Sequence, residues 1–309
     1  MKNKIIIVVL VLVIFILFIV CKRGNNSKMN VINNNISFNM EEKYVTLNNR
    51  IKMPIIGLGT WTLSNEVAEE AVYTAIKNEY RLIDTAQYYG NEVGVGNAVR
   101  KAINEGLIKR EDIFITSKIY ASTNHSKAID TTLENLNLEY VDLLLIHEPG
   151  FDDKGLYQTM EKYYEEGKIK ALGISNYYTK ESVEEVLSYA KVVPTIIQNE
   201  NHIYYQNNDL QEYVKKYGIV IESWYPFGGR GHTDENYNNE VIVKLSKKYN
   251  KTPAQIILRW HLQSGYIAIP GSKNPDHIKE NINIFDFELS EEDMKEIYNI
   301  NQMRRYENW

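Results

Sequence analysis

Short apolar stretches recur along this chain, and each is followed by a longer stretch in which apolar residues return with helical spacing. The short runs are typical of strands that are buried on both faces, and the longer ones of helices that pack by one side. In the segment 66–77, for example, Val67, Ala71 and Ala75 fall on one face. The segment 207–217 stops before Gly218, a residue suited to ending a helix. The chain therefore alternates strands with helices.

This alternation predicts the fold class. Eight strand–helix units over about 265 residues indicate a single α/β domain, a (β/α)8 TIM barrel. A short β-hairpin around Asn48-Asn49 precedes it. The rival is a doubly wound sheet, but Gly90, Gly94 and Gly96 lack the spacing of its dinucleotide-binding fingerprint. The eight strands that we predict are 55–59, 82–84, 113–118, 141–146, 171–175, 195–199, 220–223 and 267–270.

The N-terminal part has a different pattern. Residues 5–20 are uninterruptedly apolar, and basic residues flank them on both sides. At ~1.5 Å per residue this run gives roughly 25 Å of helix, the short end for a membrane span. The Asn-rich polar stretch that follows is typical of a flexible tether. We therefore predict a membrane anchor or signal-like segment over 1–23, a tether over 24–41 and the barrel over 42–309.

Two other readings of this N-terminus stay open. Cys21 lies where a lipidated cysteine would lie, which favours a lipoprotein or a cleaved signal, although residues 18–21 lack the small residues that cleavage requires. Translation from Met40 would instead give a soluble cytoplasmic protein. Beyond the apolar run, the 309 residues carry a net charge of about −5 and no dense basic block, so we expect no nucleic-acid partner. The single cysteine excludes an intramolecular disulfide.

Chemically useful side chains follow three neighbouring predicted strands. Asp84, Lys118 and His147 lie at the ends of the second, third and fourth strand, and Tyr89 follows Asp84 by five residues. Barrel enzymes place their active sites at the carboxyl ends of the strands, so we expect these residues to meet. A free tyrosine has a pKa near ~10 and is a poor acid. Lys118 should lower that pKa, and Asp84 should keep Lys118 charged.

Each residue alone has an ordinary structural explanation. Asp84 suits a helix cap, Lys118 a surface strand end and His147 a satisfied core position, and Tyr89 is one of 23 tyrosines. Their joint placement indicates a proton donor beside a cation. His147-Glu148-Pro149 lacks the second histidine of a helical metal motif, so we expect no metal site.

The order and placement of the four residues resemble the catalytic tetrad of the aldo-keto reductases, in particular the bacterial group similar to 2,5-diketogluconate reductases. The resemblance covers about residues 42–309. It implies NAD(P)H-dependent reduction of aldehydes or ketones to alcohols, with hydride from the nicotinamide and a proton from Tyr89. His147 would then bind and orient the substrate oxygen.

The resemblance also implies a cofactor site. Ser175, Asn176 and Gln198 match positions that bind the nicotinamide carboxamide. Trp224 matches a ring that stacks on the nicotinamide, a role that suits its flat surface. The glycine-rich run 228–231 suits either backbone contacts to the pyrophosphate or a plain turn.

The adenosine end departs from the family pattern. Gly271 and His277 stand where cations usually grip the 2′-phosphate of NADP. Ser272 and Lys273 can substitute in part, and His277 can add charge at lower pH. We therefore expect NADPH to be favoured and NADH to be possible. The resemblance further assigns Glu280 and Asn281 to the adenine.

The substrate pocket departs as well. Trp61 matches an aromatic wall, whereas Tyr120 and Glu148 replace residues that are tryptophan in many relatives. A carboxylate beside His147 disfavours acidic substrates, so we expect polar neutral aldehydes, ketones or sugar-like carbonyls. Alternatively, Glu148 points outward and has no role.

The competing function is a catalytically weak, cofactor-binding regulatory subunit associated with a membrane protein. NAD(P)H is plentiful in the cytoplasm and scarce outside it. We therefore expect a monomeric barrel on the cytoplasmic side of the inner membrane, tethered by its N-terminal anchor, with a small carbonyl compound as its partner. Export or lipid anchoring is the alternative location.

Overall fold

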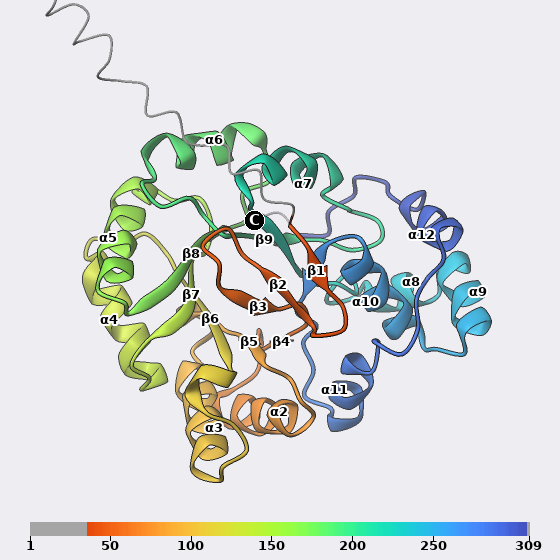
Figure 1. Ribbon diagram of the computed structural model, residues 1–309, viewed down its shortest axis with the longest axis horizontal. Coiled ribbons are helices and arrows are strands. Elements are labelled where there is room, and N and C mark those ends of the chain that lie inside the picture. Colours follow the sequence, from red (N-terminus) through yellow and green to blue (C-terminus); the bar gives the residue numbers. More distant parts are fainter. Residues whose placement is uncertain (1–35, 308–309) are drawn as a thin grey trace, which may run out of the picture. The chain divides into compact units, whose positions relative to one another are not determined.

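The barrel predicted from the sequence is confirmed. The computed structural model describes residues 36–307, which fall in one compact unit. Eight parallel strands pair in chain order, and bridges from Ile56 to Ala268 and from Gly59 to Gly271 join the last strand to the first. Helices surround the strands (Figure 1). The strands are β4 (Leu58–Gly59), β5 (Leu82–Asp84), β6 (Phe114–Ile119), β7 (Val141–Ile146), β8 (Ile169–Ser175), β9 (Ile196–Glu200), β10 (Val220–Trp224) and β11 (Tyr266–Ala268).

A small antiparallel sheet covers one end of this barrel. Its strands β2 (Tyr44–Thr46) and β3 (Lys52–Pro54) form the predicted hairpin. The side chain of Asn48 donates to the carbonyl of Pro194 (2.9 Å), just before β9, so the hairpin lies at the amino ends of the barrel strands. A third strand, β1 (Phe38–Asn39), pairs with β2. The described fold therefore includes residues 36–41, the last residues of the segment predicted to be a tether.

The helices form where the sequence supplies caps and an apolar face. Ser64 accepts a hydrogen bond from the backbone N–H of Val67 and starts α2, which buries alanine, valine and isoleucine on one side. The predicted helix 207–217 is present as α7 and a 3-10 turn, and it ends at Gly218 with φ +68°. The helices are α2 (Asn65–Lys77), α3 (Glu92–Asn104), α4 (His125–Leu136), α5 (Asp153–Glu165), α6 (Lys180–Tyr189), α7 (Asn208–Val214), α8 (Thr233–Tyr237), α9 (Glu240–Tyr249), α10 (Pro253–Gln263), α11 (Pro275–Ile282) and α12 (Glu291–Tyr298).

Within residues 36–307, no helix combines the length and apolar character needed to cross a membrane. The predicted anchor over 1–23, with Cys21, and most of the predicted tether lie outside the described residues. The carboxyl ends of the barrel strands, opposite the hairpin, carry the residues considered next.

Candidate functional site

The site is built around a buried ammonium group. Lys118 lies near the end of β6 and is 1% exposed. Its Nζ donates to Asp84 Oδ1 at 2.6 Å and to the carbonyl oxygen of Thr85 at 2.9 Å. The third donor is directed at Tyr89 Oη, 3.2 Å away. Because the phenol oxygen accepts this bond, the phenol keeps its own hydrogen for a partner on the other side.

Burial and charge act in opposite directions on this phenol. Burial raises the pKa of Tyr89 to about 12, while the charge of Lys118 works to lower it. The predicted lowering effect of Lys118 on this pKa is therefore confirmed, but the loss of solvation outweighs it, so the net pKa is raised. Burial also works to lower the pKa of Lys118, but Asp84 and Tyr89 together more than offset this, so that pKa is raised. Near neutral pH the pair is a charged lysine beside a protonated tyrosine.

His147 completes the predicted tetrad at the end of β7. Its ring packs against the rings of Tyr89 (5.6 Å between centroids) and Tyr120 (4.5 Å, nearly parallel). Burial, aided by the charge of Lys118, lowers the pKa of His147 to about 3. The imidazole is therefore neutral at physiological pH and can donate one N–H hydrogen bond without carrying a charge.

A cavity of about 550 Å³ opens above these groups. Lys118 contacts Asp84 and Tyr89 but does not itself line the cavity. His277, Glu280 and Asn281 are also absent from the lining. The predicted site residues that the cavity does bring together are Trp61, Asp84, Tyr89, Tyr120, His147, Glu148, Ser175, Asn176, Gln198, Trp224, Ser272 and Lys273.

The amide of Gln198 is held in one orientation. Its Nε2 donates to Asp84 Oδ2 and to Glu222 Oε2, both at 2.7 Å. Both amide hydrogens are thus used inside the barrel, and the carbonyl oxygen remains to accept a hydrogen bond from a ligand. This oxygen suits the NH2 of a nicotinamide carboxamide.

Glu222 is a residue of the site that the sequence analysis missed. It is fully buried on β10, and its Oε1 has no hydrogen-bond partner within the described structure. Burial, together with the charge of Asp84, raises the pKa of Glu222 to about 8. A carboxylate in the otherwise apolar start of the segment 220–224 was the signal that could have identified it.

Asn176 ties together the other predicted nicotinamide contacts. Its Oδ1 accepts from Trp224 Nε1 (3.2 Å) and from the Tyr178 hydroxyl (3.0 Å). Its Nδ2 donates to the backbone carbonyl of His147 (2.9 Å). The indole of Trp224 is therefore fixed at the cavity wall, which Ser175, the buried last residue of β8, also lines.

The comparisons with known proteins agree with this geometry. The model of the Aldo/keto reductase family matches residues 55–302. The chain belongs to the aldo/keto reductase family. It is therefore an NAD(P)H-dependent oxidoreductase that acts on carbonyl groups, as the sequence predicted.

The chain aligns with named relatives over almost the whole length of those relatives. The chain is 42% identical to glyoxal reductase of Bacillus subtilis (strain 168), over 84% of this chain and 94% of the relative. It is 37% identical to an NADPH-dependent D-xylose reductase of Meyerozyma guilliermondii, over 85% of this chain and 96% of the relative. Among solved structures, an aldo-keto reductase from a Medee basin deep-sea metagenome library is similar, with a TM-score of 0.81 and 38% identity over 86% of this chain and 97% of that one.

In this aldo/keto reductase two cations line the cavity. Lys273 and Ser272 line it after β11, and Arg230, which the sequence analysis did not single out, lines it from the loop after β10. Gly229 and Gly231 on either side of Arg230 have φ of +71° and +79°, which glycine adopts without strain. His277, by contrast, is exposed on α11. Lys273 and Arg230 suit an anionic part of a dinucleotide.

Aromatic rings surround Tyr89 and His147, and this part of the cavity is here called the near end. The ring of Trp61 lies 4.7 Å from that of Tyr89, and Tyr88 meets Tyr120 edge to face at 5.5 Å. Tyr88 is 62% exposed and was missed, although the tyrosine pair in the sequence was a signal for it. Glu148 is among the residues that line the cavity, and its role in the pocket stays a prediction.

Proposed function

We propose that this protein reduces small, polar, uncharged aldehydes or ketones with NADPH, and that Tyr89 is the proton donor. The observation that carries this proposal is the Lys118 ammonium, held between the Asp84 carboxylate and the Tyr89 phenol directly beneath the cavity. When bound, NADPH supplies the hydride that the carbonyl carbon receives. The protein's own groups then have to bind the carbonyl oxygen and donate one proton to it.

Each group has a distinct part in that task. The neutral imidazole of His147 donates a hydrogen bond to the carbonyl oxygen and orients it. Tyr89 gives its proton to the developing alkoxide. Lys118 then stabilises the phenolate, and Asp84 holds the ammonium in place. The high pKa of Tyr89 in the cofactor-free protein keeps the donor loaded with its proton before reaction.

The residues present fit a nicotinamide dinucleotide. The carbonyl of Gln198 and the fixed indole of Trp224 suit the nicotinamide end, and Lys273 with Arg230 suits the phosphates. A relative that is named NADPH-dependent supports the same cofactor. Because Gly271 and His277 leave fewer cations than the family pattern, we propose that NADPH is favoured and NADH is also used.

The substrate class follows from the near end of the cavity. The carboxylate of Glu148 beside His147 repels acidic substrates, and the aromatic walls of Trp61 and Tyr120 enclose a small space. Two relatives are named for D-xylose and for glyoxal, which supports small neutral carbonyl compounds. The regulatory-subunit alternative is not favoured, because these relatives are named as reductases.

We also propose that the barrel is held on the cytoplasmic side of the inner membrane by the apolar segment 5–20. A cytoplasmic location supports the activity because NAD(P)H is plentiful there. Fractionation of intact cells followed by external protease tests this. We expect the barrel in the membrane fraction and protected; cleavage by external protease would refute the orientation.

The activity test uses the purified full-length chain. NADPH consumption is followed with glyoxal, D-xylose and other neutral aldehydes, and with glyoxylate as the acidic counterpart of glyoxal. We expect turnover of the neutral compounds and at least tenfold lower kcat/KM for glyoxylate, about 1.4 kcal/mol of discrimination. Absence of NADPH consumption with every carbonyl would overturn the proposed function.

A further inference from the structure

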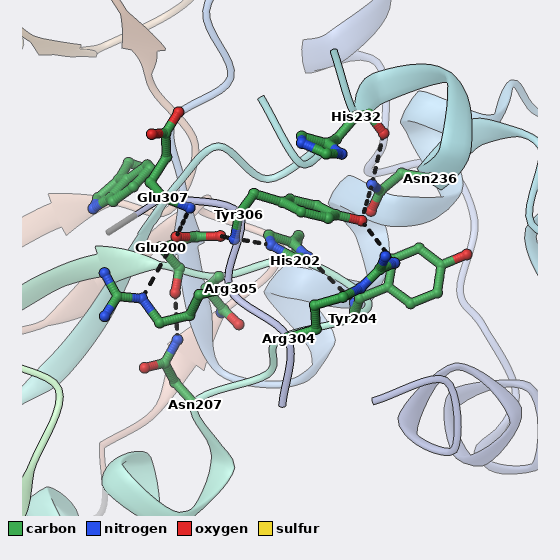
Figure 2. Close-up of polar contacts among 12 residues, drawn as sticks. Glu200, His202, Tyr204, Asn207, His232, Asn236, Arg304, Arg305, Tyr306 and Glu307 are labelled. Atoms are coloured by element: carbon green, nitrogen blue, oxygen red, sulfur yellow. Dashed lines mark hydrogen bonds and ion pairs between the residues drawn. The ribbon is translucent and has the colours of Figure 1, made fainter. Parts of the chain in front are cut away.

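A second polar cluster lies beside the cavity and involves the end of the chain. After α12, the segment 302–307, here called the C-terminal segment, returns to the barrel near the end of β9 (Figure 2). The backbone N–H groups of Gln302 and Arg304 both donate to the carbonyl oxygen of Tyr204, at 3.0 and 3.1 Å. The segment therefore has a defined path over the barrel.

Glu200 anchors this segment. It is the last residue of β9 and is fully buried. Its Oε1 accepts from the backbone N–H of Tyr306 (2.6 Å), and its Oε2 accepts from that of Glu307 (3.2 Å). His202 Nε2 lies 2.9 Å from Oε1, and Arg305 Nε lies 3.6 Å from Oε2. A buried carboxylate is costly unless it is hydrogen-bonded, and here the C-terminal segment supplies many of the partners.

The ring of Tyr306 connects the barrel to the loop between β10 and α8. It is stacked between His202 (4.3 Å between centroids) and His232 (3.8 Å). Figure 2 shows the Tyr306 ring between the two histidine rings. The Tyr306 hydroxyl donates to Glu235 Oε2 at 3.0 Å. A Cβ placed on Gly228 would come within 2.9 Å of the same ring. Tyr306 therefore packs against the loop 226–232, and Arg230 in this loop lines the cavity.

A second connection reaches the predicted nicotinamide end. The Arg305 guanidinium lies 3.6 Å from the centre of the Tyr178 ring. The Tyr178 hydroxyl donates to Asn176 Oδ1, the oxygen that also receives the indole N–H of Trp224. The C-terminal segment thus supports the cavity wall at two separate places.

We propose that Glu200 and Tyr306 are positioning residues for cofactor binding: they lock the C-terminal segment against the loop 226–232 and so slow the release of NADPH. This inference rests on the proposed function in that it takes NADPH as the ligand of the cavity. In this loop Arg230 lines the cavity, and Gly228, Gly229 and Gly231 have positive φ. Contacts with the C-terminal segment therefore help to fix the shape of the loop. The rings of His202, Tyr306 and His232 form one stack, which joins the barrel, the C-terminal segment and the loop.

The test compares Tyr306→Ala, Tyr306→Phe and Glu200→Gln with Tyr298→Ala. Tyr298 is a control from α12 that is 55% exposed. Two quantities are measured on the full-length chain: NADPH release by stopped-flow fluorescence, and amide hydrogen exchange of residues 226–232 in the cofactor-free protein. The second readout does not depend on activity or on the cofactor.

For Tyr306→Ala we expect release about tenfold faster and clearly faster exchange in the loop, because both ring stacks are lost. Tyr306→Phe keeps the stacks, so release should change by no more than about threefold. Glu200→Gln should resemble Tyr306→Ala, and Tyr298→Ala should match the wild type. If Glu200→Gln fails to fold, Tyr306→Ala still decides.

Unchanged loop exchange in Tyr306→Ala would overturn the inference, as would faster exchange with unchanged NADPH release. A wild-type protein that does not bind NADPH would overturn the proposed function and with it the role in cofactor release. In that case, faster loop exchange in Tyr306→Ala would still support the lock between the segment and the loop.

Discussion

Lys118→Met removes the buried cation at the centre of the site. The ammonium makes three contacts, to Asp84, to the carbonyl of Thr85 and to Tyr89. Methionine fills a similar volume but donates to none of them. Asp84 is 2% exposed and would retain Gln198 as its hydrogen-bond donor. The variant therefore leaves a carboxylate in the barrel without its counter-charge.

The magnitude follows from that unpaired charge. Breaking a buried ion pair by removing one partner costs about 3–5 kcal/mol of unfolding free energy. In the double variant Asp84→Asn with Lys118→Met no charge remains, and the main loss is the unpaired Thr85 carbonyl, about 1–3 kcal/mol. We therefore expect the double variant to be more stable than Lys118→Met alone.

Urea unfolding near neutral pH, followed by tryptophan fluorescence, measures the free energy of unfolding of the wild type, the two single variants and the double variant. The matched control is Lys244→Met, which breaks an exposed pair with Glu296 (2.7 Å) and should cost about 0.2–1 kcal/mol. A loss in Lys118→Met no larger than that in the control would refute the reasoning. A double variant less stable than the single one would also refute it, because the cost would then not come from the uncompensated charge.

Three further variants test the charges and the cofactor contacts. The pKa of His147 is lowered to about 3 in the folded protein, so the neutral imidazole stabilises the fold fully above a pH of about 6.5, and this stabilisation is lost as the pH falls. Between pH 7 and pH 5 the wild type should lose about 2 kcal/mol more of its unfolding free energy than His147→Asn, as measured by urea unfolding. Glu222 has the opposite sign: its raised pKa makes stability fall as the pH rises from about 4.5 to about 8, and Glu222→Gln should lack that fall in the same assay. In a fluorescence titration, Lys273→Ala should weaken NADPH binding about tenfold and NADH binding less than twofold. Equal losses for the two cofactors would show that Lys273 does not bind the 2′-phosphate.

Much of the fold could be predicted because barrel strands are buried on both faces and read as short apolar runs. All six residues of β6, for instance, are buried, including Lys118. Strand β1 could not be predicted, because a two-residue strand has no pattern of its own and depends on pairing with β2. The tetrad could be found because its residues follow consecutive strands, whose carboxyl ends meet at one end of a barrel.

The remaining parts of the site depend on contacts between distant residues. Glu222 matters because it pairs in register with Gln198 on the neighbouring strand and fixes its amide. The contact between Glu200 and Tyr306 joins residues more than a hundred positions apart. The net pKa of Tyr89 depends on how completely it is buried, which the sequence does not state.

The role of Tyr89 can be tested most directly against its neighbour. Tyr89→Phe and Tyr88→Phe each remove one hydroxyl from the cavity wall, but Tyr89 Oη alone of the two lies 3.2 Å from Lys118 Nζ. The measurement is the single-turnover rate of NADPH oxidation with a neutral aldehyde, alongside NADPH affinity. We expect Tyr89→Phe to be about 10²–10⁴-fold slower with unchanged NADPH affinity, and Tyr88→Phe to stay within about threefold of the wild type. Equal rates in Tyr89→Phe and the wild type would contradict the assignment of Tyr89 as the proton donor.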